Sequence, residues 1–530
     1  MTDRYSTLER RLRALAPLSG LCDRLVDLIG LEKEGLRVSP NGSVAMTPHP
    51  AACGSPLTHP YITTDFSEAL LELITPPFSS GAEALAFLRD LHVFVYRHLG
   101  DELIWGTSMP CVLDDARSIP LARYGGSNAA QMKTVYRRGL GNRYGRVMQI
   151  IAGVHFNFSF AEDLWPIYQA LERDQGDLRA FRDAAYMGAI RNLQRVGWLI
   201  PYLFGASPAV CKSFLKGRDN DLVSFDEHTA YAPFGTSLRM GDIGYQNQQE
   251  EGTGMKANYD SLDSYIRSLT WAIETPCPHY ESIGVKVGDR YEQLNANVLQ
   301  IENEYYSTVR PKQIAQWMER PTLALRRRGI AYIELRSLDV NAFAPLGMAS
   351  DDIDFLRVLG LYCLLQESPR INGRERRAID RNQVLTAHRG RDPALVLERG
   401  GTSVRLRDWT LELLDAMTPV ARLLDGQGDG PCQRSLGLQR AKAQDPDLTP
   451  SARMLEAMRE RGECFSAFAR RLSEQHRDWL QDQAIDPSRQ VELERTVAAS
   501  WAKQAEIEAS EDEDFDTFLA RYFAQRFSDA

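Results

Sequence analysis

Alternating polar and apolar residues predict a strand at residues 30–38, which read Gly-Leu-Glu-Lys-Glu-Gly-Leu-Arg-Val. Successive side chains of a strand point to opposite faces, so Glu32 and Glu34 share one face. The following Asn41-Gly42 is a turn signal and predicts a hairpin. Two like charges on one face repel each other. Either a divalent cation lies between them, or the strand is simply exposed to solvent.

Residues 148–160 show a long alternating pattern. One face of the predicted strand carries Ile150, Ala152, Val154, Phe156, Phe158 and Phe160, and the other carries Gln149, Ile151, Gly153, His155, Asn157 and Ser159. We expect the apolar face to pack on a core. A single histidine in a strand is more often structural, but His155 has polar neighbours on its own face, which favours a site there.

A third strand is predicted at residues 330–336, where Tyr332, Glu334 and Arg336 share one face. Glu334 and Arg336 could form an ion pair, or a metal ligand beside a guanidinium that binds phosphate. The three arginines at 326–328 are predicted to be a solvated turn.

Residues 61–77 contain Glu72 within the apolar run at 70–74 and end at Pro76-Pro77. A buried carboxylate is costly without a partner, so Glu72 is either paired or bound to a cation. Periodicity does not decide whether residues 65–72 form a helix or a strand.

Most of the remaining chain has helical spacing of its apolar residues. The predicted helices are 7–29, 82–99, 181–204 with a break near Pro201, much of 350–425, and amphipathic helices over 450–530. We expect a loop with a short helix at 106–145, a polar loop at 235–254, and a linker at 426–430. The acidic residues 511–514 are predicted to be a solvated helix start.

Composition narrows the class of protein. A chain of 530 residues with motifs spread over 300 positions predicts one large catalytic unit. Its net charge of −9, without a dense basic run, argues against nucleic-acid binding. No apolar signal core and no stretch of about 20 apolar residues is present, so we expect a cytoplasmic protein without a membrane segment. The eight cysteines are scattered without a Cys-x-x-Cys pair, which predicts free thiols rather than zinc ligands.

Several longer stretches together resemble one family, the proteobacterial type 1 glutamate–cysteine ligases. The matching stretches are 31–38, 57–59 with 62–66, 153–159, 236–239, 301–304 with 310–312, and 332–339. Within 31–38, Gly35 stands where a larger residue such as threonine is expected.

The resemblance implies an α+β fold related to glutamine synthetase, in which a curved, mostly antiparallel sheet forms an active-site funnel surrounded by helices. It implies a catalytic core at 1–345 with a mainly helical C-terminal region, 346–530, packed on it. The implied activity joins the γ-carboxylate of L-glutamate to the amine of L-cysteine through γ-glutamyl phosphate, using ATP and Mg²⁺, which Mn²⁺ can replace. It also implies a monomer subject to feedback inhibition by glutathione.

The same resemblance assigns roles to residues of this chain. The implied metal ligands are Glu32, Glu34, Asp65, Glu72, His155 and Glu334, with hydrogen bonding as the structural alternative for Asp65 and His155. Arg336 is the implied catalytic residue, with an ion pair to Glu334 as its alternative. Arg310 and Lys312 are implied to bind the nucleotide, and Gln149 the glutamate. The implied cysteine site comprises Tyr136, Leu140, Arg239, Tyr245 and Tyr306, for which core packing (or, for Arg239, a surface charge) is the alternative.

Two rival functions remain at the level of sequence. One is a ligase of the same superfamily that joins glutamate to a different amine. Arg239 disfavours it, because an amine without a carboxylate would not need that guanidinium. The other is a non-catalytic regulator that binds nucleotide or metal. The complete acidic set together with Arg336 disfavours this second alternative.

Overall fold

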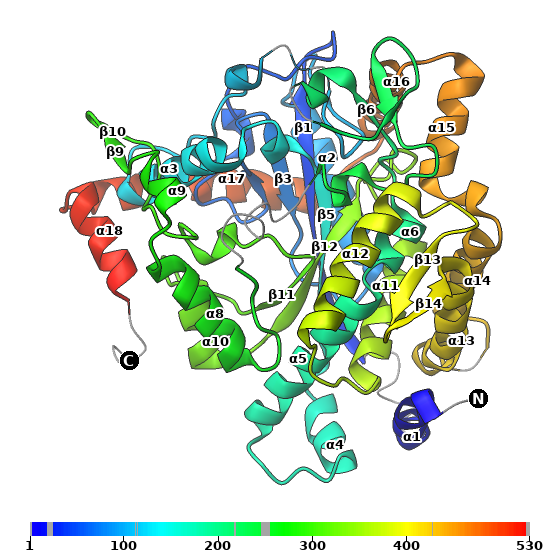
Figure 1. Ribbon diagram of the computed structural model, residues 1–530. Coiled ribbons are helices and arrows are strands. Elements are labelled where there is room, and N and C mark those ends of the chain that lie inside the picture. Colours follow the sequence, from blue (N-terminus) through cyan, green and yellow to red (C-terminus); the bar gives the residue numbers. More distant parts are fainter. Residues whose placement is uncertain are drawn as a thin grey trace.

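The structure is a computed structural model that describes residues 3–17, 25–111, 113, 115–216, 219–244, 255–426 and 428–525. Its centre is a seven-stranded antiparallel sheet (Figure 1). Along the sheet the strands lie in the order β11 (Val309–Lys312), β12 (Tyr332–Asp339), β5 (Gly153–Phe160), β1 (Val26–Val38), β3 (Leu70–Ile74) and β2 (Ile62–Thr64), and β4 (Leu103–Ile104) also pairs with β1.

The longest strand, β1, holds the middle of the sheet, between β5 and β3. The chain turns directly after it: the amide of Ser39 donates to the carbonyl of Ser43, and Val38 bridges Val44. Gly42 has a φ of 83°, a left-handed conformation that glycine adopts without strain. The hairpin predicted from Asn41-Gly42 is therefore confirmed.

One face of the sheet packs on helices. Phe156 and Phe158 of β5 are buried there, as the alternating pattern predicted. The helices α2 (Gly81–Tyr96), α5 (Leu178–Val196), α6 (Leu199–Phe204) and α11 (Ser350–Leu365) contact the strands. At Gly360 of α11 a Cβ atom would lie 2.7 Å from Cε2 of Phe158, so a glycine lets this helix approach the sheet closely.

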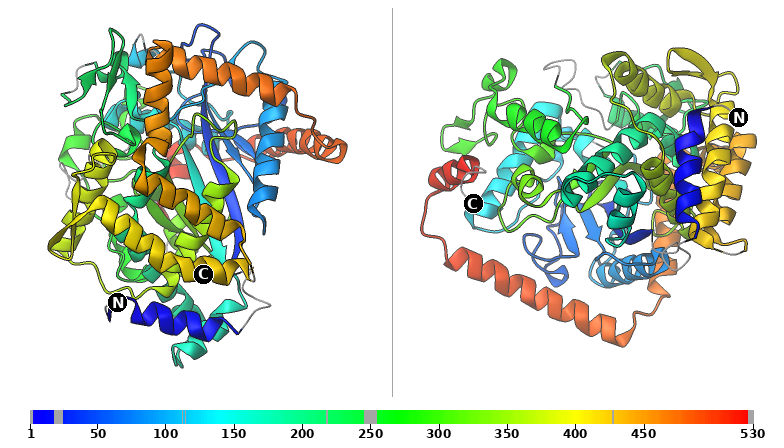
Figure 2. Two further views of the ribbon diagram at one scale, coloured as in Figure 1. Left: turned by 90° about the vertical axis from the view of Figure 1, so that its right-hand side faces the viewer. Right: turned by 90° about the horizontal axis from the view of Figure 1, so that it is seen from below.

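Further helices surround this centre. They are α1 (Ser6–Leu15), α3 (Asn128–Tyr144), α4 (Leu164–Leu171), α8 (Leu262–Glu274), α9 (Pro278–Glu281), α10 (Pro321–Arg328), α12 (Gly373–Arg389), α13 (Leu406–Asp425), α14 (Pro431–Gln444), α15 (Pro450–Arg461), α16 (Phe465–Gln481), α17 (Pro487–Ala509) and α18 (Phe515–Ala524). Figure 2 shows α17 running along one edge of the molecule, and α18 beyond it. Asp514 caps α18 by accepting from the amide of Thr517, as expected of an acidic helix start.

Short antiparallel sheets lie outside the centre. They are β6 (Ala209–Cys211) with β8 (Thr229–Tyr231) and β7 (Val223–Ser224), β9 (Lys286–Val287) with β10 (Arg290–Tyr291), and β13 (Val396–Arg399) with β14 (Thr402–Arg405). The hairpin of β13 and β14 interrupts the region predicted as helical over 350–425. The α+β class, with a mostly antiparallel sheet among helices, is confirmed.

Three predicted boundaries were wrong. The first helix ends at Leu15, and Ile29, counted as its last apolar residue, belongs to β1. Residues 148–150 form a 3-10 helix, η5 (Met148–Ile150), so the strand begins only at Gly153. The arginines at 326–328 form the last turn of α10 rather than a free turn, where positive charge faces the helix C-terminus.

Two open or underestimated segments are now defined. Residues 61–77 form two strands, β2 and β3, and Glu72 lies in β3. The helix expected to be short within 106–145 is α3, which is 17 residues long. None of the helices in the described ranges is both long and apolar enough to cross a membrane.

Candidate active site

The strand register places the predicted acidic residues in one row across the sheet. Glu34 of β1 lies opposite Glu72 of β3, and Glu32 lies opposite His155 of β5. On the next strand pair, Glu334 of β12 lies opposite Asn157. Residues directly opposite each other in an antiparallel pair point to the same face. Four strands therefore present carboxylates, imidazole and amide on the face away from α2 and α11.

These side chains are in contact. Nδ1 of His155 lies 2.9 Å from Oε2 of Glu32 and 3.8 Å from Oε1 of Glu334, and its Nε2 lies 3.7 Å from Oε1 of Glu34. Asn157 donates to the other oxygen of Glu32 at 2.9 Å. Ligand atoms of Glu32, Glu72 and His155 all lie within 4.8 Å of one another. All members of the predicted metal set except Asp65 thus converge on one point.

Crowding of negative charge shifts the titration of these groups. Burial, followed by the charges of Glu32, Asp65 and Glu34, raises the pKa of Glu72 well above its usual range. Burial also raises the pKa of Glu34. Burial would raise the pKa of Glu32 too, but the hydrogen bond with His155 and the positive charges nearby together outweigh that effect and the pKa is lowered. The row therefore holds more negative charge than its protein partners neutralise.

The donor set fits a hard divalent cation. Such ions prefer several carboxylate oxygens, and an imidazole nitrogen is an acceptable additional ligand. Oε2 of Glu334 is buried and accepts no hydrogen bond from the described residues. A cation bound among Glu32, Glu34, Glu72, His155 and Glu334 would satisfy that oxygen and remove the repulsion that raises the pKa of Glu72.

Positive groups lie beside the row, on the side of β11 and β12. Nη1 of Arg336 is 2.9 Å from Oε1 of Glu334, so the predicted ion pair exists. Nζ of Lys312 is 3.7 Å from Oε2 of Glu334. Burial opposes the charge on Lys312, but Glu334, Tyr332 and Glu32 together raise its pKa and keep it protonated. Arg310 donates to the carbonyls of Asn303 and Tyr305 and thereby fastens the segment that precedes β11.

A cavity of about 440 Å³ opens in front of the row. Its lining includes most of the predicted site residues: Glu32, Glu34, Asp65, Glu72, Tyr136, Leu140, Gln149, His155, Tyr306, Arg310, Lys312, Glu334 and Arg336. They come from β1, β3, β5, β11, β12, α3 and the connecting segments. The sheet forms the floor of the cavity, and α3 with residues 301–321 forms its walls.

Asp65 lies toward the cavity mouth, with 44% of its side chain exposed. Its Oδ1 is 3.6 Å from Nη2 of Arg137, and Arg137 also donates to the backbone carbonyl of Asp65. The structure thus supplies a protein partner for Asp65, and its metal role stays a prediction.

Arg239 is buried rather than at the surface, so the surface-charge alternative was wrong. It lies in the 3-10 helix η7 (Leu238–Met240), donates to the carbonyl of Arg336 at 2.9 Å, and has Asp339 Oδ1 3.9 Å away. A Cβ at Gly153 would lie 2.1 Å from Nη2 of Arg239, so the glycine makes room for the guanidinium. Arg239 is not among the residues that line the cavity, and its role in binding cysteine stays a prediction. Tyr245 lies outside the described residues.

Gln149 reaches the cavity from η5, not from the His155 strand as the alternating pattern suggested. Its Oε1 accepts a hydrogen bond of 2.7 Å from the hydroxyl of Tyr306. Its amide nitrogen is buried and has no partner among the described residues. A donor that faces the cavity in this way is available to a carboxylate or carbonyl of a ligand.

Several polar residues of the cavity were missed from the sequence: Lys133, Arg137, Asn303, Glu319 and Tyr522. Lys133 and Arg137 lie on the face of α3 that carries Tyr136 and Leu140. Had 128–144 been recognised as a helix, the spacing of 3 and 4 residues would have placed all four on one face. Tyr522 of α18 also lines the cavity. No local signal in the sequence could indicate that contact.

Gly35 has a steric explanation in this chain. A Cβ at this position would lie 2.5 Å from Cγ2 of Ile104 and 3.2 Å from Nζ of Lys33. Lys33 is buried on the far face of β1, where burial lowers its pKa to about 8. The glycine therefore accommodates a bulky neighbour behind the sheet without disturbing Glu32 and Glu34.

Comparisons with known proteins identify the family to which the chain belongs. Residues 24–385 match the sequence profile of a family described as glutamate–cysteine ligase. The chain is 48% identical over 518 residues to a glutamate–cysteine ligase of Pseudomonas paraeruginosa, covering 98% of both chains. It is 46% identical over 523 residues to that of Alcanivorax borkumensis, covering 97% of this chain and 99% of the relative.

Solved structures show the same likeness. A crystal structure of glutamate–cysteine ligase from Francisella tularensis in complex with AMP superposes with a TM-score of 0.89 at 34% identity, covering 94% of this chain and 98% of that one. A bifunctional glutathione synthetase from Pasteurella multocida superposes with a TM-score of 0.69 at 24% identity. It covers 90% of this chain and 55% of its own length, and shares the fold.

Proposed function

The chain belongs to the glutamate–cysteine ligase family, and from this premise we propose how its own residues divide the work of the reaction. The enzyme uses ATP to ligate the γ-carboxylate of L-glutamate to the amine of L-cysteine, the first step of glutathione biosynthesis. The assignment of roles below is supported by the acidic row on the floor of the cavity, which is the single observation that carries it.

Glu32, Glu34, Glu72, His155 and Glu334 are proposed to hold divalent cations, with Mg²⁺ as the physiological ion and Asp65 as a further ligand at the mouth. When bound, such ions neutralise the negative charge of the ATP phosphates and of the phosphoryl group in transfer. The support is that carboxylate oxygens of Glu32, Glu34 and Glu334 lie within 3.8 Å of His155 and that Glu72 lies within 4.8 Å of it, together with the raised pKa of Glu72.

Arg336, Lys312 and Arg310 are proposed to face the phosphates. A carboxylate and an amine do not condense in water, so the reaction needs an activated acyl group, which we propose to be γ-glutamyl phosphate. Negative charge then builds up twice, first on the transferred phosphoryl group and then on the tetrahedral adduct with the amine. The Arg336 guanidinium, held at 2.9 Å by Glu334, is oriented before either charge appears.

An adenine nucleotide is proposed to enter the same cavity, by analogy with the AMP named for the Francisella tularensis relative. Gln149 is proposed to donate its unpartnered amide to glutamate. Cysteine is proposed to bind between Tyr136, Leu140 and Tyr306, with Arg239 and Tyr245 taken from the resemblance. Tyrosine hydroxyls suit the polar ends of this substrate and their rings suit its thiol side chain.

Residues 1–345 are proposed to be the catalytic core and 346–530 a helical region that supports it, with Tyr522 as a contribution of the latter to the cavity. A cytoplasmic location, a monomeric state and feedback inhibition by glutathione remain proposals on the strength of the resemblance alone.

The experiment is an assay of ADP release with Mg²⁺ and a panel of amino acids. We expect turnover to require both glutamate and cysteine, and we expect Glu32→Gln to abolish it because an amide lacks the charge that a hard cation needs. Asp27→Asn is the matched control, since it makes the same change on β1 outside the cavity lining and should keep activity. Near-normal turnover of Glu32→Gln would contradict the metal assignment. Preference for an amine without a carboxylate would contradict the cysteine site.

A further inference from the structure

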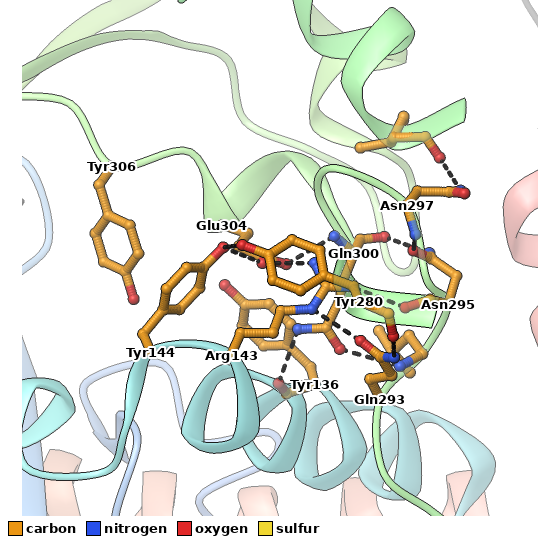
Figure 3. Close-up of polar contacts among 12 residues, drawn as sticks. Tyr136, Arg143, Tyr144, Tyr280, Gln293, Asn295, Asn297, Gln300, Glu304 and Tyr306 are labelled. Carbon is orange, nitrogen blue, oxygen red and sulfur yellow. Dashed lines mark hydrogen bonds and ion pairs between the residues drawn. The ribbon is translucent and has the colours of Figure 1, made fainter. Parts of the chain in front are cut away.

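Behind the wall formed by Tyr136 and Tyr306 lies a fully buried ion pair, Glu304 with Arg143 (Figure 3). Both side chains have 0% exposure, and Oε1 of Glu304 is 2.8 Å from Nη1 of Arg143. The same oxygen accepts a hydrogen bond of 2.7 Å from the hydroxyl of Tyr144. Oε2 of Glu304 accepts a hydrogen bond of 2.7 Å from the backbone amide of Gln300. Both oxygens of the carboxylate are therefore fixed by donors.

Arg143 is held as firmly. Its Nε donates to Gln293 at 2.9 Å and its Nη2 to the carbonyl of Asn295 at 2.7 Å. The guanidinium lies 4.1 Å from the ring centroid of Tyr280, whose hydroxyl contacts that of Tyr144 at 3.3 Å. Burial raises the pKa of Tyr144, so its phenol remains a hydrogen-bond donor.

This network connects the two cavity walls from behind. Arg143 and Tyr144 end α3, whose preceding turns carry Tyr136 and Leu140. Glu304 ends η8 (Glu302–Glu304), two residues before Tyr306. Gln300 donates its side-chain amide to the carbonyl of Tyr136 at 3.3 Å. A Cβ at Gly139 would lie 2.1 Å from Oε1 of Gln300, so the two walls are in close contact.

Tyr144 also touches the cavity wall directly. Its ring meets the ring of Tyr306 edge to face, with centroids 5.9 Å apart and planes at 89°. Tyr306 in turn donates to Gln149 at 2.7 Å. A change in the position of Tyr144 therefore reaches both Tyr306 and Gln149 without any contact between Glu304 and the cavity.

Stability alone is a weak reason for such a pair. Burying two charges is costly, and apolar residues of similar volume often stabilise a protein as well or better. What a buried, fully hydrogen-bonded pair provides is directional geometry. Here that geometry is set between the two segments that shape one pocket.

We propose that Glu304, acting with Arg143 and Tyr144, is a positioning residue that sets the width of the cysteine pocket between Tyr136 and Tyr306 and so the selectivity for that amine. The inference rests on the proposed placement of cysteine at these two tyrosines. It adds three residues that touch neither substrate nor nucleotide.

The test uses the full-length enzyme and three variants. Tyr144→Phe keeps the ring against Tyr306 but loses the hydrogen bond to Glu304, and Glu304→Gln replaces the charge. Glu302→Gln is the matched control: it lies in the same 3-10 helix, is also buried, and pairs with Arg320 at 3.2 Å instead. For each we measure Tm, kcat, the KM values for cysteine, glutamate and ATP, and kcat/KM for cysteine relative to an analogue one methylene longer.

We expect the KM for cysteine to rise roughly five- to ten-fold in Tyr144→Phe, less than the full worth of a hydrogen bond to a charged group, because only part of the change reaches the pocket. In Glu304→Gln it should rise at least roughly ten-fold, since Arg143 loses its charged partner. In both variants the KM values for ATP and glutamate should stay within about three-fold of those of the unmodified enzyme, and the preference for cysteine over the longer analogue should fall. Glu302→Gln should change neither the KM for cysteine nor this preference.

A loss of Tm in both variants, with the KM values and the selectivity unchanged as in the control, would overturn the inference and leave a structural role only. If Glu304→Gln does not fold, Tyr144→Phe decides the outcome. Tyr306→Phe distinguishes a wrong placement of cysteine from a failure of the positioning role. If it changes the KM for glutamate and not for cysteine, the placement of cysteine is wrong. If it raises the KM for cysteine while Tyr144→Phe does not, only the positioning role fails.

Discussion

Replacing Glu72 by glutamine should make the metal-free protein more stable and the Mg²⁺-bound protein less so. Glu72 accepts no hydrogen bond from any described residue, and its ligand atom lies within 4.8 Å of those of Glu32 and His155. At an effective dielectric constant of about 20, two unit charges at that separation repel by about 3.5 kcal/mol. Glutamine has nearly the same shape and removes this repulsion.

The direction of the pKa shift of Glu72 also predicts that the metal-free variant is more stable than the unmodified protein. The pKa of Glu72 is raised in the folded protein, so above the unfolded value of about 4.3 the folded state holds a proton that the unfolded chain releases. The stability of the unmodified protein therefore falls as the pH rises above about 4.3. The shift can cost at most about 3.7 kcal/mol at pH 7, at about 1.36 kcal/mol per pH unit. Since Arg137 also loses an attractive partner, we expect a net gain of about 1–3 kcal/mol in the variant.

Urea and thermal unfolding are measured in a chelator and in Mg²⁺. In the chelator, Glu72→Gln should unfold at a higher urea concentration and at a Tm a few degrees higher, with an advantage that disappears below about pH 4. In Mg²⁺ at 100 times its Kd, the unmodified enzyme should gain about 2.7 kcal/mol and the variant less. Asp27→Asn on β1 should change neither value by more than about 0.5 kcal/mol. The reasoning would be refuted if Glu72→Gln were less stable than the unmodified protein in the chelator, or if Mg²⁺ stabilised both proteins equally.

Three further predictions concern other parts of the molecule. Burial lowers the pKa of His49 and of His59 to about 4, so both side chains stay neutral in the folded protein. Their contribution to the free energy of unfolding should be fully present above about pH 6.5 and should fall toward pH 4, by at most about 1.4 kcal/mol per pH unit for each histidine. A urea midpoint that does not change between about pH 6.5 and pH 4 would contradict this expectation. Arg239→Ala should raise the cysteine requirement by roughly ten- to a hundred-fold and change the glutamate and ATP requirements much less; loss of ATP or glutamate binding, with the response to cysteine kept, would show that the pocket is misplaced. The seven described cysteines are free thiols, and titration of the unfolded chain without reductant should count all eight of the sequence, whereas a reproducible shortfall of two would indicate a disulfide.

The strands that carry the carboxylates could be predicted because alternation is a local property. Glu32 and Glu34 had to share a face once residues 30–38 were taken as a strand, and the same holds for Glu334 and Arg336. Alternation alone could not place the start of β5, since the 3-10 turn at 148–150 is only three residues long, too short to distinguish its three-residue period from the two-residue period of a strand. Gln149 was therefore assigned to the right cavity from the wrong element.

Contacts between distant segments could not be predicted in this way. Arg239 was expected in a polar loop, yet it is buried because Gly153, far away in the sequence, leaves space for its guanidinium. The length of α3 was underestimated because its glycines at 139 and 141 lower helix propensity. Gly139 is explained only by the close approach of Gln300.

The position of Tyr522 has a consequence for how the enzyme is made. Ribosomes deliver the carboxylates of β1 and β3 early, but α18 comes far later in the sequence, and α17 must first extend along the edge of the molecule (Figure 2). A nascent chain that has already paired its central strands therefore still has an incomplete cavity wall. Synthesis itself would delay ATP consumption until α18 has been made, and a truncated product that lacks α18 would be folded in its sheet yet lack Tyr522 at its reaction chamber.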